Sequence, residues 1–246
     1  MAPGRAAVIK LICFVKRNPA LDVEEFHRHW RERHAAIIVE TPDLAGRLVR
    51  YEQNHRPLAD YGQPGRPDFD GVAIQWFDSM DDFVGMVSSD GYRDRLAPDE
   101  AFMLDGDGLR WILTDPEETV MPGSQGRDGR LCKVHTMLRR KPGMAVEEFH
   151  RYWREVHGPL FRDTPALARH VQRYEQNHRA TDDYQRPGAH EFDGVAIQWF
   201  SSPDDFWAMA TDDAYPDTVG ADNPRFLDRG ALTWILTDKE EVIIDG

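Results

Sequence analysis

The chain has 246 residues, enough for two domains of ordinary size, and 41% of them are hydrophobic, which excludes a disordered protein. Its formal net charge of −13 repels nucleic acid and anionic lipid, so we expect neither as a partner. No apolar run approaches the roughly 20 residues that cross a membrane, so we expect no membrane association, and we expect no signal peptide.

The first predicted strand covers residues 8–16, which are apolar and β-branched. Asp22 follows a turn, and Glu25 stands three residues later, the spacing of a helix capping box. We therefore predict a helix from this cap to about residue 37.

The remaining elements of the first half follow from the same signals. Ser79, followed after one residue by two acidic residues, predicts the start of a second helix that ends near residue 88. The stretch 92–106 is expected to be irregular with a short helical piece. Three further strands are predicted at 47–55, 69–77 and 109–115, with a Pro- and Gly-rich loop at 56–68. This order is β-α-β-β-α-β, the ferredoxin-like unit.

The sequence contains an internal repeat. VEEFHRHWRERH begins at residue 23 and VEEFHRYWREVH begins at residue 146, a shift of 123 residues. Under the same shift RYEQNH, FDGVAIQWF and WILTD each fall on an identical copy. We predict one repeat at 1–120, a linker at 121–130 within a segment rich in Gly, Pro and charge, and a second repeat at 131–246.

A single unit of this kind covers one face of its sheet with helices and leaves the other face bare. Two units can close their bare faces against each other. The predicted fold class is therefore α+β: two ferredoxin-like β-α-β-β-α-β repeats that form an internal pseudo-dimeric α+β barrel. Association of two chains into a homodimer stays open.

The motifs resemble a known family. A helix with Phe26, Trp30 and His34, followed by YEQNH and by a strand that ends in Trp76 and Phe77, is similar to the EthD family of the dimeric α+β barrel superfamily. The resemblance covers nearly the whole of both halves. It implies the barrel, and it implies cofactor-free or oxygen-linked chemistry on hydrophobic, often aromatic or polyketide-like molecules.

Histidines that recur in both halves are the first catalytic candidates. At 100° per residue, His34 and its copy His157 lie at the edge of the apolar stripe of the first helix. An imidazole with a pKa near 6.5 suits a general acid or base at neutral pH. The structural alternative is a histidine that caps the end of the helix. Because His157 precedes Gly-Pro, as in the family, we expect two inequivalent pockets, the second closer to the family pattern.

The strand RYEQNH has polar residues on both faces, which an ordinary half-buried strand does not. Tyr51 and His55 share one face, as do their copies Tyr174 and His178. These side chains either polarise a substrate oxygen in a pocket or belong to a hydrogen-bonded seam across the barrel.

The substrate-binding candidates are aromatic walls, loop tyrosines and amides beside small alanines. The loop tyrosines act either as a lid or as an anchor. The candidates are Trp30, Trp153, Tyr61, Tyr184, Gln75 and Gln198.

No motif predicts a cofactor. The chain lacks GxGxxG, a P-loop and GxSxG, and His27 lies two helical turns from His34, roughly 10 Å by the helical rise and too far for joint metal ligation. We expect no metal and no cofactor. Cys13 and Cys132 lie among apolar strand residues outside any CxxC, which favours unpaired thiols in the cytoplasm.

The leading function is a cofactor-independent lyase, dehydratase, cyclase or isomerase that acts on a hydrophobic aromatic, lactone or polyketide-like substrate by His/Tyr proton transfer. The first alternative is a cofactor-free monooxygenase. The second is a non-catalytic accessory protein of a degradation pathway that binds a hydrophobic ligand.

Overall fold

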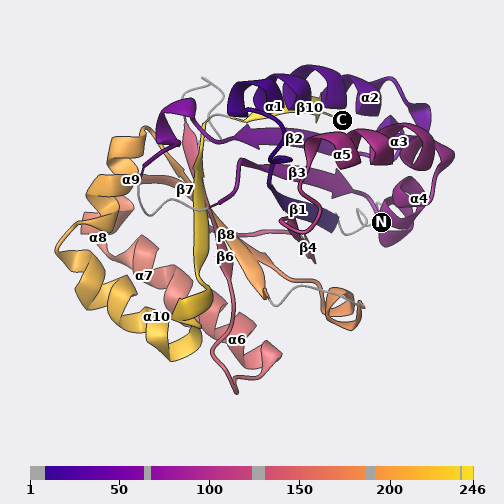
Figure 1. The fold of residues 1–246 in the computed structure, drawn as a ribbon. Helices are drawn as coiled ribbons and strands as arrows, with labels where there is room; N and C mark the ends of the chain where they lie inside the picture. The colour runs from indigo at the N-terminus through magenta and orange to yellow at the C-terminus, as the bar shows by residue number, and fades with distance from the viewer. Residues whose placement is uncertain (1–8, 64–67, 124–130, 187–191, 239, 246) are drawn as a thin grey trace. The chain divides into compact units, whose positions relative to one another are not determined.

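The computed structural model describes residues 9–63, 68–123, 131–186, 192–238 and 240–245, which form two compact units (Figure 1). The first unit comprises Met1–Pro116 and Glu240–Gly246, and the second comprises Glu117–Lys239. Each unit thus combines most of one repeat with the segment that follows the other repeat.

Each unit contains one antiparallel sheet of five strands. The order in the first unit is β10 (Glu241–Asp245), β2 (Arg50–His55), β3 (Gly71–Phe77), β1 (Ile9–Val15) and β4 (Arg110–Thr114). The order in the second unit is β5 (Glu118–Met121), β7 (Val171–His178), β8 (Gly194–Phe200), β6 (Cys132–Leu138) and β9 (Thr233–Thr237). Without the first strand of each list, both orders are those of the ferredoxin-like unit, so the predicted α+β fold class of two repeated halves is confirmed.

The two outer strands are exchanged between the repeats. β5 follows the first repeat and pairs with β7, whereas β10 follows the second repeat and pairs with β2. The sequence analysis missed both strands, because it predicted no strand after residue 115 in the first repeat and none after the second WILTD in the second repeat. Each exchanged strand covers a sheet edge that would otherwise carry unpaired backbone groups. Residues 124–130 of the expected linker region, and 64–67 of the expected loop, lie outside the described residues.

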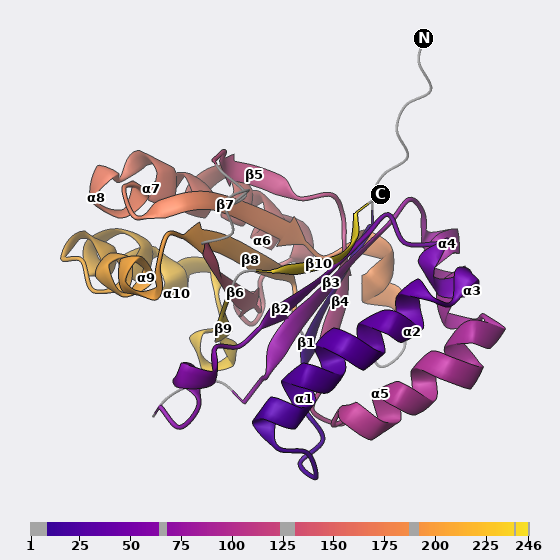
Figure 2. The same ribbon diagram turned by 90° about the horizontal axis from the view of Figure 1, so that it is seen from above.

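The α-helices of each unit lie along one side of its sheet (Figure 2). Short 3-10 and π-helical turns complete the helical segments. In the first unit they are α1 (Val23–His29), the π-helical turn η1 (Trp30–His34), α2 (Ala35–Val39), α3 (Pro42–Ala45), the 3-10 turn η2 (Leu58–Asp60), α4 (Met80–Val87), the π-helical turn η3 (Tyr92–Leu96) and α5 (Ala97–Met103). In the second unit they are α6 (Val146–Tyr152), η4 (Trp153–His157), α7 (Gly158–Asp163), α8 (Pro165–Ala168), η5 (Thr181–Gln185), α9 (Pro203–Ala210), η6 (Pro216–Gly220), α10 (Ala221–Phe226) and η7 (Arg229–Ala231).

Both predicted helix caps of the first half are confirmed. The Asp22 carboxylate accepts the backbone N–H of Glu25 at 2.6 Å, and the Ser79 hydroxyl accepts the N–H of Asp82 at 3.1 Å. These contacts satisfy backbone donors that the first helical turn leaves free. They also orient the helices that carry the aromatic core residues.

The prediction for 92–106 was largely wrong, because η3 and α5 together form twelve helical residues without a break, from Tyr92 to Met103. Pro98 stands directly after the wide π-helical turn, in the first residues of α5. This error matters because α5 carries two polar residues of the candidate site.

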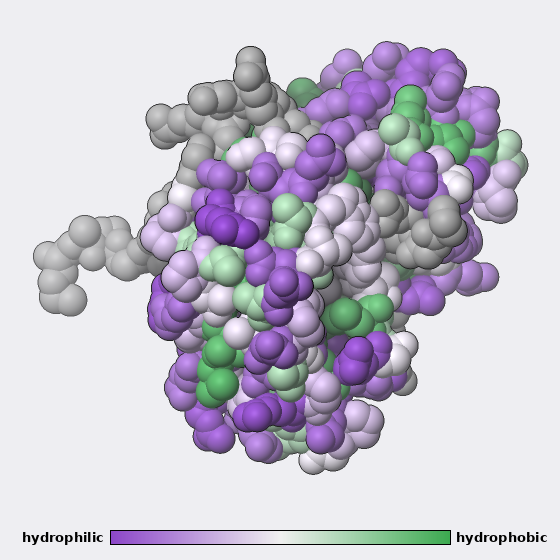
Figure 3. Space-filling view, turned by 90° about the vertical axis from the view of Figure 1, so that its left-hand side faces the viewer, coloured by the Kyte–Doolittle hydropathy of each residue, from purple (hydrophilic) through white to green (hydrophobic). Residues whose placement is uncertain are grey.

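The core of the first unit lies between its sheet and its helices. Tyr51 and Phe77 of the sheet, both fully buried, pack with Phe83 and Met86 of α4 and with Ile38 of α2. Hydrophilic residues dominate the molecular face shown in Figure 3, and hydrophobic residues there form only small separate spots. In the first unit, the large buried apolar side chains lie between the sheet and the helices.

Candidate functional site

A cavity of about 180 Å³ lies between the sheet and the helices of the first unit. Its walls are largely apolar, with Trp30, Phe83 and Trp111 as aromatic members. Its polar lining comes from Cys13, His34, Tyr51, Gln75, Tyr92 and Glu100. This mixture of apolar walls and a few polar groups is typical of small-molecule sites.

Strand register forms the floor of the cavity. Cys13 of β1 pairs with Ala73 of β3 and with Trp111 of β4, so the three side chains share one sheet face. The small Ala73 side chain leaves space between its larger neighbours. Burial raises the pKa of the Cys13 thiol to about 12, so this cysteine is a neutral wall of the cavity and not a nucleophile.

The π-helical turn η1 brings Trp30 and His34 to the same cavity. The N–H of Ala35 bonds to the Trp30 carbonyl, five residues back, instead of the usual four. Both side chains are buried and line the cavity. Such wide turns frequently occur at functional sites, because they change the direction in which successive side chains point.

His34 forms a dyad with an aspartate of α5. The Nδ1 atom of His34 lies 2.9 Å from Oδ2 of Asp99, whose Oδ1 lies 2.7 Å from Nε2 of His29. Burial alone would raise the pKa of Asp99, but the hydrogen bonds from His34 and His29 lower it below its ordinary value. An ionised Asp99 only accepts, so Nδ1 of His34 carries the hydrogen. Nε2 of His34 has no hydrogen-bond partner within the described part of the chain.

Tyr51 presents its hydroxyl as a donor. Its oxygen accepts hydrogen bonds from Nε1 of Trp30 at 3.2 Å and from Nε2 of Gln53 at 3.0 Å. These two donors occupy the acceptor sites of the oxygen, so its own hydrogen is available to a ligand. Burial raises the pKa of Tyr51, so this side chain stays neutral and keeps its hydrogen.

Two further polar groups have unused capacity. The carboxylate of Glu100 accepts the Tyr92 hydroxyl on Oε2 at 2.9 Å, and burial raises the pKa of this glutamic acid. Gln75 is 8% exposed, and its buried Oε1 has no hydrogen-bond partner among the described residues. A buried amide oxygen without a partner is rare in folded proteins, and a ligand in the cavity would satisfy it.

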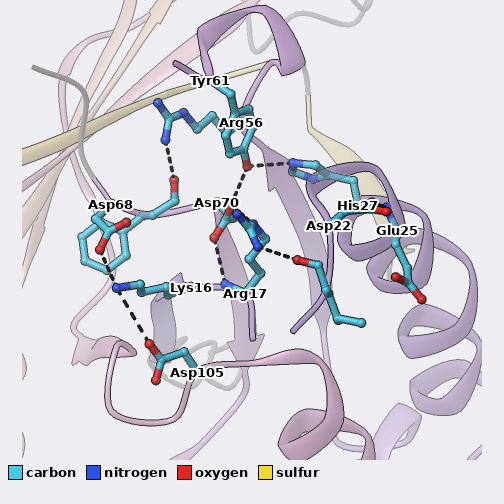
Figure 4. A network of polar contacts seen from close by, with 12 residues as sticks. Lys16, Arg17, Asp22, Glu25, His27, Arg56, Tyr61, Asp68, Asp70 and Asp105 are labelled. Atoms are coloured by element: carbon cyan, nitrogen blue, oxygen red, sulfur yellow. Dashed lines mark hydrogen bonds and ion pairs between the residues drawn. The ribbon is translucent and has the colours of Figure 1, made fainter. Parts of the chain in front are cut away.

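A hydrogen-bonded chain leads away from the cavity. Gln53 Oε1 lies 3.1 Å from Nε2 of His55, whose Nδ1 lies 2.8 Å from Nδ1 of His27. Nε2 of His27 lies 3.0 Å from the Tyr61 hydroxyl, which lies 2.7 Å from Oδ1 of Asp70 (Figure 4). The chain therefore joins the amide beside Tyr51 to the loop that carries Tyr61.

The second unit repeats the dyad and the chain. His157 Nδ1 lies 2.9 Å from Oδ2 of Asp222, and the Nδ1 atoms of His150 and His178 lie 2.8 Å apart. The corresponding cavity, however, measures about 70 Å³. Of these two corresponding cavities, the one in the first unit is the more spacious.

The structure brings only some of the predicted site residues together. Those that line the two cavities are His34, Trp30, Tyr51 and Gln75 in the first unit and His157, Trp153, Tyr174 and Gln198 in the second. His55, His178, Tyr61 and Tyr184 do not line them, and lie in the two hydrogen-bonded chains. For the tyrosines this geometry corresponds to the anchor interpretation, because Tyr61 and Tyr184 each contact a histidine and an aspartate.

The sequence analysis missed Asp99 and Glu100. The repeat contained a usable signal, because Asp99 falls on Asp222 under the same shift that aligns the two histidines. Glu100 falls on Asn223, so no test of repetition would have found it.

The family model of the EthD domain matches residues 18–107 and 141–230, which is well over half of the chain. The chain belongs to the EthD family. This membership confirms the resemblance seen in both halves. No curated protein matches the sequence.

Several solved structures share the fold across the whole EthD chain. An anthrone oxidase-like protein has a TM-score of 0.65 at 11% identity, with 98% of this chain and 94% of that chain covered. A monooxygenase candidate from Fusobacterium nucleatum subsp. nucleatum has a TM-score of 0.57 at 9% identity, covering 96% and 94%. A mutant chlorite dismutase from Candidatus Nitrospira defluvii has a TM-score of 0.53 at 13% identity, covering 94% and 91%. At such identities the likeness concerns the fold alone.

Among the described residues, no helix is long and apolar enough to cross a membrane. In the same residues, no group of three or more His, Cys, Asp or Glu side chains could hold a metal ion.

Proposed function

We propose that this EthD protein is a cofactor-independent enzyme that moves a proton on a small, hydrophobic substrate, as a lyase, dehydratase, cyclase or isomerase. The observation that carries the proposal is the His34–Asp99 dyad at the wall of a mostly apolar cavity. A base that is oriented by a carboxylate and shielded from bulk water is the arrangement that general-base catalysis requires.

The residues support a definite first step. Nε2 of His34 takes a proton from a C–H next to a carbonyl, or from a phenolic or enolic O–H. When a C–H bond breaks, its electron pair moves onto the carbonyl oxygen, and the Tyr51 hydroxyl donates a hydrogen bond to that oxygen. Asp99 stabilises the imidazolium that forms.

The second step returns the proton. Delivery from His34 to a different carbon completes an isomerisation. Delivery to a hydroxyl group that leaves as water, while the electron pair of the anion forms a double bond, completes a dehydration. Neither the isomerisation nor the dehydration consumes an electron or an external reactant. His34 and Tyr51 end each catalytic cycle in their starting protonation states.

A cofactor-free monooxygenase is the second candidate, and the apolar walls favour it. An apolar cavity accommodates molecular oxygen, and deprotonation by His34 would give an electron-rich anion that can reduce it. The anthrone oxidase-like protein and the monooxygenase candidate are named for oxygen-using chemistry of this kind. Their likeness to this chain concerns the fold alone. For either reaction we place the enzyme in the cytoplasm, because its two cysteines are free thiols.

Native mass spectrometry of the purified protein tests the proposal by identifying a co-purified ligand and following it over time. We expect wild type to convert the ligand without oxygen uptake, and His34→Ala to bind it unchanged. Oxygen uptake in step with ligand loss would establish the monooxygenase instead. A ligand that stays unchanged on wild type, His34→Ala and His157→Ala would establish a binding protein.

A further inference from the structure

The two cavities share several lining residues but have different volumes. In each unit the same four residue types line the cavity at equivalent positions: Trp30, Tyr51, Ala73 and Gln75 in the first, and Trp153, Tyr174, Ala196 and Gln198 in the second. The volumes are nevertheless about 180 Å³ and about 70 Å³. On the sheet side Thr136 lines the second cavity where Cys13 lines the first. These two side chains are similar in size, so this exchange accounts for little of the difference, and the helical side is the other place to compare.

Two phenylalanines fill the helical side of the second unit. Phe161 and Phe226 stand where the repeat has Ile38 and Met103. Their ring centroids lie 5.8 Å and 4.6 Å from that of His157. Phe226 is held in place because it stacks on the rings of Phe149 and Tyr152, at 5.7 Å and 5.4 Å. Phe161 lines the second cavity and Phe226 packs against His157, which also lines it, so larger aromatic side chains occupy the helical side of the second unit.

The volumes decide which cavity can hold a ring. An apolar cavity of about 150 Å³ is known to accept benzene. The first cavity exceeds this volume by an amount that allows one or two small substituents, whereas the second has about half of it. By this comparison a single ring fits the first cavity and is too large for the second.

One polar lining residue differs between the two cavities, and it indicates which substituent the ring has. Glu100 lines the first cavity, and Asn223 replaces it in the second. One carboxylate oxygen of Glu100 accepts the Tyr92 hydroxyl, and the other has no hydrogen-bond partner among the described residues. A ligand hydroxyl is both donor and acceptor, so it satisfies this oxygen whether Glu100 is ionised or neutral.

We propose that only the first cavity takes up substrate, that the substrate is a single ring with a hydroxyl group that binds Glu100, and that the second cavity is a closed copy. This inference deepens the proposed function and rests on it, because the bound ring is a substrate only if the protein is an enzyme. It makes Glu100 the residue that determines specificity, distinct from the base His34.

Isothermal titration calorimetry with matched probes tests the inference without any turnover. The probes are the three dihydroxybenzenes and the three methylphenols, which pair a hydroxyl with a methyl of similar size at each ring position. Titrations are carried out under nitrogen to prevent oxidation of the probes. We expect one site per chain, and at least one dihydroxybenzene that binds about tenfold more tightly than its methylphenol counterpart.

Three variants locate the site. Ala73→Leu fills the first cavity and should abolish binding, whereas Ala196→Leu, the same change in the second cavity, should leave it unaltered. Glu100→Asn copies the second half and should reduce the preference for the dihydroxybenzene to about onefold. Glu100→Asn keeps the inference testable if Ala73→Leu does not fold.

Four results would overturn the inference: two equivalent sites, loss of binding in Ala196→Leu, an unchanged hydroxyl preference in Glu100→Asn, or no binding of any probe to wild type. The proposed function fails separately, through turnover that does not require His34. Binding as expected with no catalysis would support the ring-binding site and refute the enzymatic function.

Discussion

The Nδ1 atoms of His27 and His55 face each other at 2.8 Å, and both rings are buried. A hydrogen bond between them needs one atom to donate and the other to accept. At the ends of their hydrogen-bonded chain stand two acceptors, the carboxylate of Asp70 and Oε1 of Gln53. The Gln53 amide cannot turn round, because its nitrogen donates to the Trp30 carbonyl at 2.8 Å.

This hydrogen-bonded series of side chains has one hydrogen fewer than it has contacts. Four contacts join the two acceptors through Tyr61, His27 and His55, and these three groups carry three hydrogens when both imidazoles are neutral and Asp70 is ionised. One contact therefore lacks a hydrogen. The hydrogen-bonded series can gain one proton. A second proton would make both imidazoles positively charged, side by side.

We therefore expect the pair to titrate in two separated steps. Burial lowers the pKa of His27 to about 4, and burial together with the charge of His27 lowers the pKa of His55 to about 2. Nitrogen-15 NMR of the imidazole rings between pH 7 and pH 3 measures the first step directly. A single step near pH 6.5 for both rings would contradict the buried pair.

The same histidines make stability depend on pH. Because the pKa of His27 and of His150 is lowered to about 4 in the folded chain, the unfolded chain binds more protons between pH 6.5 and pH 4. The free energy of unfolding should thus fall as pH falls through this window, by up to about 1.4 kcal/mol per pH unit for each histidine. Urea unfolding at several pH values measures the slope. His27→Gln and His150→Gln should each reduce it, and a slope unchanged in both variants would refute the linkage.

Asp99→Asn tests the dyad. The new amide can donate to Nδ1 of His34, which then holds its hydrogen on Nε2 and can no longer act as a base. We expect kcat to fall on the order of 10²- to 10⁴-fold with little change in KM. Asp222→Asn, the same change beside His157, is the matched control and should leave kcat within about twofold of wild type. Equal losses in both variants would show that both halves catalyse.

Tyr51→Phe separates stability from catalysis. The change leaves the buried N–H groups of Trp30 and Gln53 without their acceptor, at a cost of about 1–3 kcal/mol for each unsatisfied donor. Tyr174→Phe in the second half should cost a similar amount, because Trp153 and Gln176 make the same contacts. Only Tyr51→Phe should also lower kcat, on the order of 10²-fold. Chemical denaturation and steady-state kinetics on the two variants distinguish the effects, and equal kcat values would exclude Tyr51 from the reaction.

Truncation after Glu240 tests the exchanged strand. The shortened chain lacks β10, whose backbone pairs with β2 and whose Ile243 and Ile244 pack on the first core. Hydrogen exchange should accelerate at the β2 amides that pair with β10 and should stay unchanged in β7. Uniform acceleration in both strands would mean that β10 stabilises the whole chain and not one sheet edge.

Much of this protein could be predicted from its repeated sequence. The shift that aligns the two halves identified the ferredoxin-like order, and the capping residues Asp22 and Ser79 placed two helix starts correctly. His34, Trp30 and Tyr51 were singled out because each recurs in the second half, and all three line the cavity. Local backbone preferences and hydrophobic periodicity act over a few residues, so the sequence alone determined these features.

The tertiary structure decided the rest. Asp99 is 65 residues from His34 along the chain, and no local pattern joins them. The exchange of β5 and β10 depends on which sheet edge is free, and the different volumes of the two cavities depend on how Phe161 and Phe226 pack. Contacts between distant residues follow from the packing of whole elements, because each side chain is positioned by neighbours that the chain brings together only on folding.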